Sequence, residues 1–200
     1  MAKYLILTDY QHVFVDGPLG SARARNLHPH IRKKVLKRIS QGWQVVITYD
    51  THDEKNYLHT MEGRHLPVIH GIEGTPGWQI YGNLLEEIKE AMKEYNLKHG
   101  DGSQEDYGPL IVKKNTFGYT EWKYLIPDAE EIEVIGLCTD ICVVSNVLIL
   151  KAQFPEIYIS VDANCCAGLT DEAHWAALRT MVSCQVHVYH DGKLWPIENE

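Results

Sequence analysis

The sequence contains no long apolar run. A membrane-spanning helix needs roughly 20 consecutive apolar residues, and no stretch of these 200 residues approaches that length. The beginning of the chain has one lysine and then a short apolar segment, which does not resemble a signal peptide. Internal repeats and low-complexity tracts are also missing. We therefore expect a cytoplasmic protein that acts without contact with a membrane.

Cysteine is scarce and positive charge is in deficit. The five cysteines are an odd number, and their spacing fits neither a disulfide framework nor a zinc ribbon, which favours a reducing compartment. The formal net charge is −8, and the one basic cluster, residues 32–38, has the spacing of a solvated helix face. This charge balance argues against nucleic acid as a partner.

What the sequence does contain is the composition of an ordinary globular protein, with 44% hydrophobic and 23% charged residues. The length suits one domain, residues 1–200, with a sizeable core. Predicted strands alternate with predicted helices, which indicates a three-layer α-β-α fold around a central, mostly parallel sheet of about six strands. We expect strands at residues 3–8, 44–49, 110–112, 132–137, 157–161 and 186–189, and helices at residues 30–41, 84–95 and 171–181 and from residue 142 onwards.

Two stretches lack a clear period. Residues 98–108 are polar and contain glycine, so we interpret them as an exposed loop. The stretch 51–77 is too long for a simple connection, and loops of that length in compact domains are usually functional or disordered.

Chemically active side chains follow four consecutive predicted strands. Ligands of open parallel sheets bind at the carboxyl ends of the strands, so these side chains should meet at one edge. Each also has a purely structural explanation, with Asp9 as a turn former, His52 as a solvated loop residue and Lys114 as a surface cation. In chain order the side chains are Asp9, Asp50, His52, Lys113, Lys114 and Cys142.

Cys142 stands where a buried strand turns into an apolar helix. The field of the helix N-terminus favours thiolate over thiol there, although a free cysteine can equally be a small buried core residue. A carboxylate such as Asp9 can take the thiol proton, and the Lys114 ammonium can stabilise both anions. The backbone N–H groups of Cys138 and Cys142 would form an oxyanion hole. This set predicts acyl transfer through a thioester.

A second group of residues has the chemistry of a metal site. One carboxylate and two imidazoles, completed by water, suit zinc, manganese or iron. The spacing of Asp50 and His52 lets both side chains of an extended segment face one ion. His59 and His65 are rival candidates that we rank lower, as surface residues of the loop. The predicted ligands are Asp50, His52 and His70, with Glu62 as a possible fourth.

Five short segments, in order between residues 9 and 168, carry recognisable motifs. They are residues 9–17 (D-x-Q-x-x-F-x-x-G), 50–52 (D-x-H), 70–77 (near H-C-x-x-G-T-x-G), 114–118 (a lysine motif) and 136–143 (G-x-x-T-D-x-C-V). Together they resemble the isochorismatase-like cysteine hydrolases and, within them, the nicotinamidase/pyrazinamidase branch. The sequence departs from this pattern at Gly71, where cysteine is frequent, and at Gly118, where serine is frequent.

The resemblance implies a catalytic triad of Asp9, Lys114 and Cys142, with Lys114 preferred over Lys113 because it keeps Phe117 in register. It also implies a cis peptide bond between residues 137 and 138. It further implies one divalent metal ion, with zinc as the first choice, that binds the pyridine nitrogen of the substrate. The substrate-binding residues on this interpretation are Phe14, Phe117 and Leu137.

The activity implied by the resemblance is hydrolysis of nicotinamide to nicotinate and ammonia. A different small amide, such as a carbamoyl or ureido compound, is the second interpretation. Isochorismatase-type vinyl ether hydrolysis is weaker because Cys142 is present. A thiol redox or sensing protein, with Cys138 resolving Cys142, is the alternative outside the hydrolases. Family members often associate, so we expect a homo-oligomer.

Overall fold

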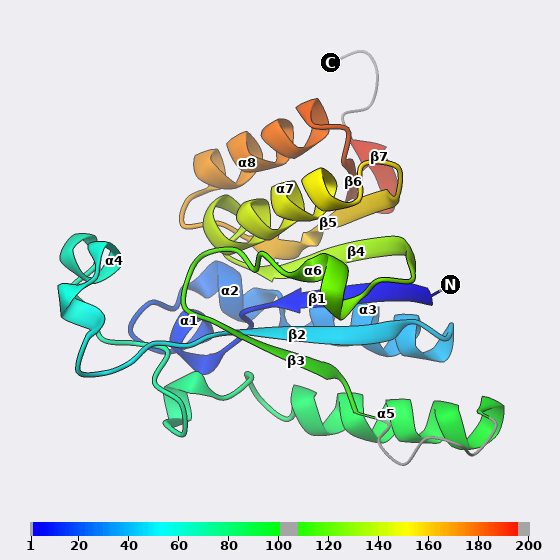
Figure 1. Ribbon diagram of the computed structural model, residues 1–200, viewed down its shortest axis with the longest axis horizontal. Helices are drawn as coiled ribbons and strands as arrows, with labels where there is room; N and C mark the ends of the chain where they lie inside the picture. Colours follow the sequence, from blue (N-terminus) through cyan, green and yellow to red (C-terminus); the bar gives the residue numbers. More distant parts are fainter. Residues whose placement is uncertain (1, 101–107, 196–200) are drawn as a thin grey trace.

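The computed structural model describes residues 2–100 and 108–195 and contains one central sheet (Figure 1). Within these residues the sheet has seven strands in the order β3-β2-β1-β4-β5-β6-β7, all parallel to their neighbours except β7, which is antiparallel to β6. The strands are β1 (Ala2–Thr8), β2 (Gln44–Asp50), β3 (Leu110–Lys114), β4 (Ala129–Leu137), β5 (Tyr158–Ala167), β6 (His187–His190) and β7 (Lys193–Trp195).

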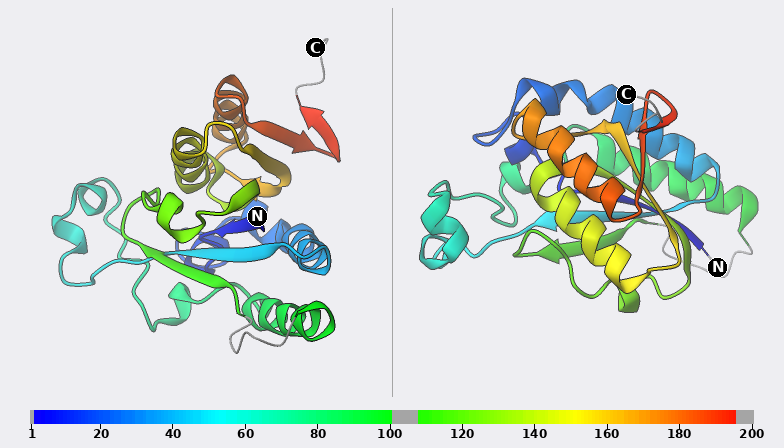
Figure 2. Two further views of the ribbon diagram at one scale, coloured as in Figure 1. Left: turned by 45° about the vertical axis from the view of Figure 1, so that its right-hand side comes forward. Right: turned by 90° about the horizontal axis from the view of Figure 1, so that it is seen from above.

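Helices cover both faces of the sheet (Figure 2). Helices α3 and α5 pack together on one face, and α6, α7 and α8 lie on the other. The three-layer α-β-α prediction is therefore confirmed. The helices are α1 (His12–Val15), α2 (Ala22–Asn26), α3 (His28–Ser40), α4 (Met61–His65), α5 (Leu84–His99), α6 (Trp122–Leu125), α7 (Val144–Gln153) and α8 (Asp171–Ser183).

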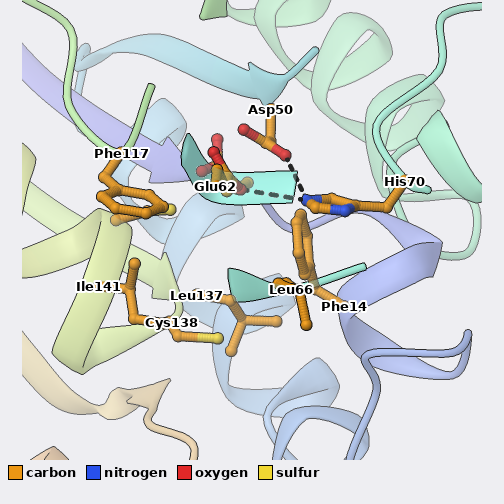
Figure 3. Close-up of a pocket in the computed structure, with 11 residues that line it drawn as sticks. Phe14, Asp50, Glu62, Leu66, His70, Phe117, Leu137, Cys138 and Ile141 are labelled. Atoms are coloured by element: carbon orange, nitrogen blue, oxygen red, sulfur yellow. Dashed lines mark ion pairs between the residues drawn. The ribbon is translucent and has the colours of Figure 1, made fainter. Parts of the chain in front are cut away.

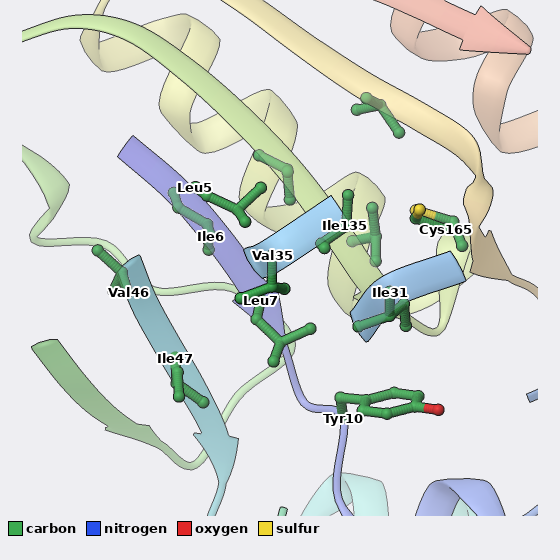
Figure 4. Close-up of a cluster of buried hydrophobic side chains, with 14 of the residues drawn as sticks. Leu5, Ile6, Leu7, Tyr10, Ile31, Val35, Val46, Ile47, Ile135 and Cys165 are labelled. Atoms are coloured by element: carbon green, nitrogen blue, oxygen red, sulfur yellow. The ribbon is translucent and has the colours of Figure 1, made fainter. Parts of the chain in front are cut away.

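The core lies between the sheet and its helices. Strand β1 is buried from Tyr4 to Thr8, as expected for a parallel strand that is covered on both faces. Helix α3 buries Ile31, Val35 and Ile39, which recur at the spacing of one helix face. Figure 4 shows Ile31 and Val35 in the same apolar cluster as Leu7 of β1. This packing holds the carboxyl end of β1 in place.

Several element bounds differ from the predictions. The short antiparallel strand β7 was not predicted and brings the strand number from about six to seven. Strand β5 continues to Ala167, well beyond the predicted end at residue 161. Helix α3 begins at His28 because Pro29 occupies its first turn, where proline needs no amide partner. Helix α5 continues to His99, so the first residues of the predicted loop at 98–108 are helical, and residues 101–107 lie outside the described residues.

The long stretch after β2 is not a featureless loop. It contains a 3₁₀ turn at Tyr57–His59, helix α4 and a second 3₁₀ turn at Pro76–Trp78. In Figure 1 the part around α4 projects from the body of the molecule, on the side where β1 ends. In the described residues no helix is long and apolar enough to cross a membrane.

Candidate active site

The carboxyl ends of four strands meet at one edge of the sheet and bring the predicted residues together. Asp9 directly follows β1, while Asp50 and Lys114 are the last residues of β2 and β3 and are register partners. Strand β4, on the other side of β1, leads into the turn that carries Cys138 and Cys142. These residues are far apart in the sequence, and the parallel sheet is what makes them neighbours.

Asp9 and Lys114 form a buried ion pair. The Lys114 Nζ atom lies 2.5 Å from Asp9 Oδ2, and the hydroxyl of Thr48 donates a hydrogen bond of 2.6 Å to Asp9 Oδ1. Burial raises the pKa of Asp9 above its usual value, and the nearby Asp50 carboxylate adds to this rise, although Lys114 opposes it. Burial works against the Lys114 ammonium, but the negative charges of Asp9 and its neighbours keep its pKa above the usual value. A carboxylate beside a permanent cation is thus held ready to exchange a proton.

The structure distinguishes between the two adjacent lysines. Side chains alternate across a strand, so Lys113 and Lys114 point to opposite faces of β3. Lys113 is exposed and pairs with Glu73 above the ring of Trp78. Lys114 is the lysine that faces Asp9 and Asp50. Its position agrees with the sequence-based preference for Lys114.

The environment of Cys142 differs from the expected one. The residue lies inside a π-helical turn, Thr139–Val143, and the regular helix α7 begins only at Val144. Burial raises the pKa of the Cys142 thiol well above its usual value, and Asp9 raises it further, while Lys114 lowers it. The expectation that the helix N-terminus favours thiolate is therefore wrong for the free protein. Asp9 lines the same pocket as the thiol and acts on it electrostatically, so Asp9 is the carboxylate base beside Cys142.

The turn before Cys142 has an unusual backbone. The peptide bond between Leu137 and Cys138 is cis, as the family resemblance implies. The carbonyl of Cys138 accepts hydrogen bonds from the amides of Ile141 and Val143. Asn146 Nδ2 donates a hydrogen bond of 2.8 Å to the carbonyl oxygen of Cys142. These contacts close the chain into a tight loop around the thiol. The oxyanion-hole role of the Cys138 and Cys142 amides stays a prediction.

The four predicted metal ligands form one cluster. Asp50 Oδ2 lies 3.0 Å from His52 Nε2 and 3.2 Å from His70 Nε2, and Glu62 Oε1 lies 3.6 Å from both imidazoles. One ligand atom from each of the four side chains lies within 4.8 Å of the other three. His59 and His65 are not members of the cluster, in agreement with their lower rank.

The donor set of this cluster suits a divalent cation. Asp50 Oδ2 and His52 Nε2 are buried without an aligned hydrogen-bond partner among the described residues, although the two atoms are close together. Such buried polar atoms are costly unless something satisfies them, and a metal ion would do so. The other nitrogen of His70, Nδ1, is 2.7 Å from the carbonyl oxygen of Val68, which fixes the ring so that Nε2 faces the cluster.

The charges of the cluster shift the pKa values of its members. Burial alone would raise the pKa of Asp50, but the two imidazoles and Lys114 hold it well below its usual value. Burial would lower the pKa of His70, but the nearby carboxylates of Asp50 and Glu62 raise it to about 10. The carboxylates therefore attract a positive charge, which a proton or a metal ion can supply.

A small pocket connects the thiol with the cluster (Figure 3). In Figure 3 Phe14 and His70 lie on one side of the pocket, and Phe117 and Ile141 lie on the other. The predicted residues Phe14, Phe117 and Leu137 all line it, together with Asp9, Asp50, Glu62, Leu66, His70, Cys138, Ile141 and Cys142. A wider, mostly apolar cavity of about 650 Å³ adjoins it and shares Glu62, Leu66, Phe117 and Ile141 with its wall.

Sequence reasoning missed four residues of the site. Thr48 binds Asp9, and Gln11 clamps the backbone of Asp50 by accepting from its amide at 2.8 Å and donating to its carbonyl at 3.1 Å. Gln11 occupies the glutamine position of the motif at residues 9–17, and this position is the signal that could have identified it. Leu66 and Ile141 line the pocket without any local signal that separates them from other apolar residues.

The chain is similar to several known proteins over most of its length. No family model matches the chain. A Bacillus subtilis protein described as an uncharacterized isochorismatase family protein PncA is 30% identical over 88% of this chain and 92% of that protein. The crystal structure of the nicotinamidase PncA from Bacillus subtilis has a TM-score of 0.72 at 26% identity and covers 94% of this chain and 99% of that one. The pyrazinamidase of Pyrococcus horikoshii, in complex with zinc, has a TM-score of 0.73 at 19% identity and covers 95% and 99%, which shows likeness of fold.

Proposed function

Since the chain belongs to the isochorismatase family, we propose that it is a cysteine hydrolase that converts nicotinamide to nicotinate and ammonia. The observation that carries this proposal is that Cys142 and Asp9 line one pocket that also contains a metal-type cluster. A buried thiol with its own base is the requirement for attack on a carboxamide. The likeness to the nicotinamidase PncA from Bacillus subtilis supports this choice of substrate.

The reaction begins with the transfer of the Cys142 proton to Asp9. The sulfur then forms a bond to the amide carbon, and the carbonyl oxygen becomes an oxyanion that the amides of Cys138 and Cys142 stabilise. When the C–N bond breaks, Asp9 returns the proton to nitrogen and ammonia leaves, so that a thioester to Cys142 remains. Water, deprotonated by Asp9, cleaves the thioester and regenerates the thiol and the free acid.

Lys114 supports this proton movement without transferring the proton itself. Its ammonium stays charged beside Asp9, because the surrounding negative charges raise its pKa. The ammonium opposes the rise of the Cys142 pKa and therefore stabilises the thiolate as it forms. Thr48 fixes the other oxygen of Asp9, so that one carboxylate is oriented by two donors.

The residues of the cluster would hold one divalent ion, for which zinc is our first choice and manganese or iron also suit the donors. Such an ion would supply Lewis acidity next to the substrate ring. Phe14 packs edge-on against His70, with 5.6 Å between the ring centroids, and Phe117 lies across the pocket. These two side chains would confine a flat ring between the cluster and Cys142.

The proposal is tested by ammonia release from nicotinamide with purified protein. We expect wild-type turnover and its loss in Cys142→Ala, because the variant lacks the sulfur that forms the proposed thioester. Cys184→Ala is the matched control, since Cys184 is exposed and is not part of the pocket. Wild-type turnover in Cys142→Ala would overturn the assignment of the nucleophile.

A second small amide remains a candidate substrate because of the wide cavity next to the pocket. This cavity gives room for a carbamoyl or ureido compound that is larger than nicotinamide. A panel of small amides, assayed for ammonia with and without added divalent metal, separates the two interpretations. Turnover of another amide that is faster than that of nicotinamide, and independent of metal, would favour the second.

The redox alternative loses support from the pKa values of its two thiols. Oxidant sensors use accessible thiols of low pKa. Burial raises the pKa of Cys138 to about 12 and raises that of Cys142 as well.

A homo-oligomer stays a prediction, to be checked by light scattering.

A further inference from the structure

Helix α8 contacts the turn between Cys138 and Cys142 through a buried side chain. His174 lies in the N-terminal part of α8, and its Nδ1 atom is 2.8 Å from the hydroxyl oxygen of Thr139. Thr139 is fully buried and His174 is 8% exposed, so solvent has little access to this hydrogen bond. Thr139 directly follows Cys138, whose amide is the proposed oxyanion donor.

A second contact ties the same turn to the chain that leads into α8. Asp140 Oδ1 accepts a hydrogen bond of 3.1 Å from the amide of Leu169. The close approach requires glycine at position 168, because a Cβ atom there would lie 2.8 Å from Asp140 Oδ1 and 3.0 Å from the amide nitrogen of His174. Both residues after Cys138 are thus anchored to the start of α8.

The turn needs such anchors because its backbone is not a regular helix. Residues Thr139–Val143 form a single π-helical turn, and π-turns are rare and occur mainly at functional sites. An oxyanion hole works only when its N–H groups already point at the position of the developing charge. A small displacement of these groups lowers the rate even when the substrate still binds.

We propose that His174 is a positioning residue of the hydrolase, which holds the oxyanion-hole turn through its hydrogen bond with Thr139. His174 touches neither the substrate pocket nor the metal-type cluster and acts only through the backbone of the turn. This inference rests on the proposed amide hydrolysis. It adds helix α8 to the strand ends and the turn that build the site.

The test compares variants that remove the hydrogen bond with variants that keep it. Thr139→Val and His174→Leu preserve shape and remove the bond, whereas Thr139→Ser keeps the hydroxyl and His174→Asn places an amide near the position of Nδ1. We expect the first pair to lower kcat for nicotinamide by about 10- to 100-fold with KM changed by less than about threefold, because the loss falls on the transition state. The second pair should stay near wild type.

An aldehyde inhibitor reports on the oxyanion hole directly. The Cys142 sulfur adds to the carbonyl carbon of pyridine-3-carbaldehyde and forms a hemithioacetal. The former carbonyl oxygen of this adduct occupies the oxyanion site, whereas nicotinate forms no such adduct. In Thr139→Val and His174→Leu the inhibition constant of the aldehyde should rise by the same factor by which kcat falls. The inhibition constant of nicotinate should stay constant. The double variant should be no worse than either single variant, because both remove the same bond.

The outcomes separate this inference from the function on which it rests. A wild-type protein that hydrolyses no amide overturns both. An active wild type with unchanged kcat and aldehyde inhibition in Thr139→Val and His174→Leu overturns the role of His174 alone. Equal weakening of aldehyde and nicotinate binding, with a lower melting temperature, also overturns it, because a purely structural defect gives that pattern.

Discussion

The Lys114 ammonium lies 2.5 Å from the Asp9 carboxylate, and their side chains are only 2% and 1% exposed. A buried ion pair of this kind is a poor source of stability, because the loss of hydration of both charges offsets their attraction. Its value here lies in the charge that it places beside Cys142. Lys114 lowers the pKa of Asp50, and the two charges of the pair shift the pKa of Cys142 in opposite directions.

Replacing either lysine of β3 by methionine gives a matched pair of variants. Lys114→Met leaves the Asp9 charge buried without a partner, so we expect loss of turnover and a decrease of about 3–5 kcal/mol in the free energy of unfolding. Lys113→Met removes only an exposed pair with Glu73, so stability should change by about 1 kcal/mol or less. Urea unfolding and ammonia release measure both effects. Equal losses in the two variants would contradict the assignment of Lys114.

Thr48→Val tests the second donor to Asp9. The valine has nearly the same shape, but Asp9 Oδ1 then loses its 2.6 Å hydrogen bond. We expect a decrease of about 1–3 kcal/mol in the free energy of unfolding, and a lower kcat because Asp9 is less well oriented. Thr48→Ser keeps the hydroxyl and serves as control. If kcat is the same in Thr48→Val and wild type, the orientation of Asp9 does not depend on Thr48.

The sequence allowed the meeting of the site residues to be predicted, because the topology of a parallel sheet requires it. Asp9, Asp50 and Lys114 stand at strand ends, and such ends converge wherever the strands pair in parallel. The long stretch after β2 was correctly singled out, since it contributes Glu62 and His70 to the cluster. The order of strands within the sheet, with β1 between β2 and β4, is visible only in the structure.

Other features could not be predicted because they depend on packing between distant segments. Thr48 looks like any β-branched strand residue until the neighbouring strand places Asp9 beside it. The thiol of Cys142 was expected to favour its anion from the local turn, but burial by the surrounding layers outweighs that field. Local sequence thus indicates which groups are present, while their pKa values are set by the tertiary structure.

Metal content measures the cluster directly. We expect purified wild-type protein to bind one divalent ion per chain, Asp50→Asn and His70→Ala to lose it, and Glu62→Gln to hold it more weakly. His59→Ala is the control, because His59 lies nearby outside the cluster. Because a ligand of the folded state stabilises it, zinc at 100 times its dissociation constant should add about 2.7 kcal/mol to the free energy of unfolding. Equal metal content in Asp50→Asn and wild type would exclude this site.

Alkaline pH should destabilise the protein through its buried thiols. Burial raises the pKa of Cys166 well above its usual value, and the neighbouring Cys165 adds to the rise. The unfolded chain releases the Cys166 proton near its ordinary pKa of about 8.5, whereas the folded chain keeps it. The unfolded state therefore binds fewer protons, and the stability present below about pH 8.5 is lost as the pH rises, by up to about 1.4 kcal/mol per pH unit for each such thiol.

Cys166→Ala isolates this contribution. The variant removes a buried side chain and will be less stable at every pH, so the slope of the unfolding free energy against pH is the quantity to compare. The comparison covers the range from about pH 8.5, the ordinary thiol pKa, to about pH 10.5. In this range unfolding of the variant should release about one proton fewer than unfolding of wild type, so its free energy of unfolding should fall less steeply with pH. Urea unfolding at three pH values measures the slopes. Parallel slopes would mean that the Cys166 thiol loses its proton equally easily in the folded and the unfolded chain, against the burial seen in β5.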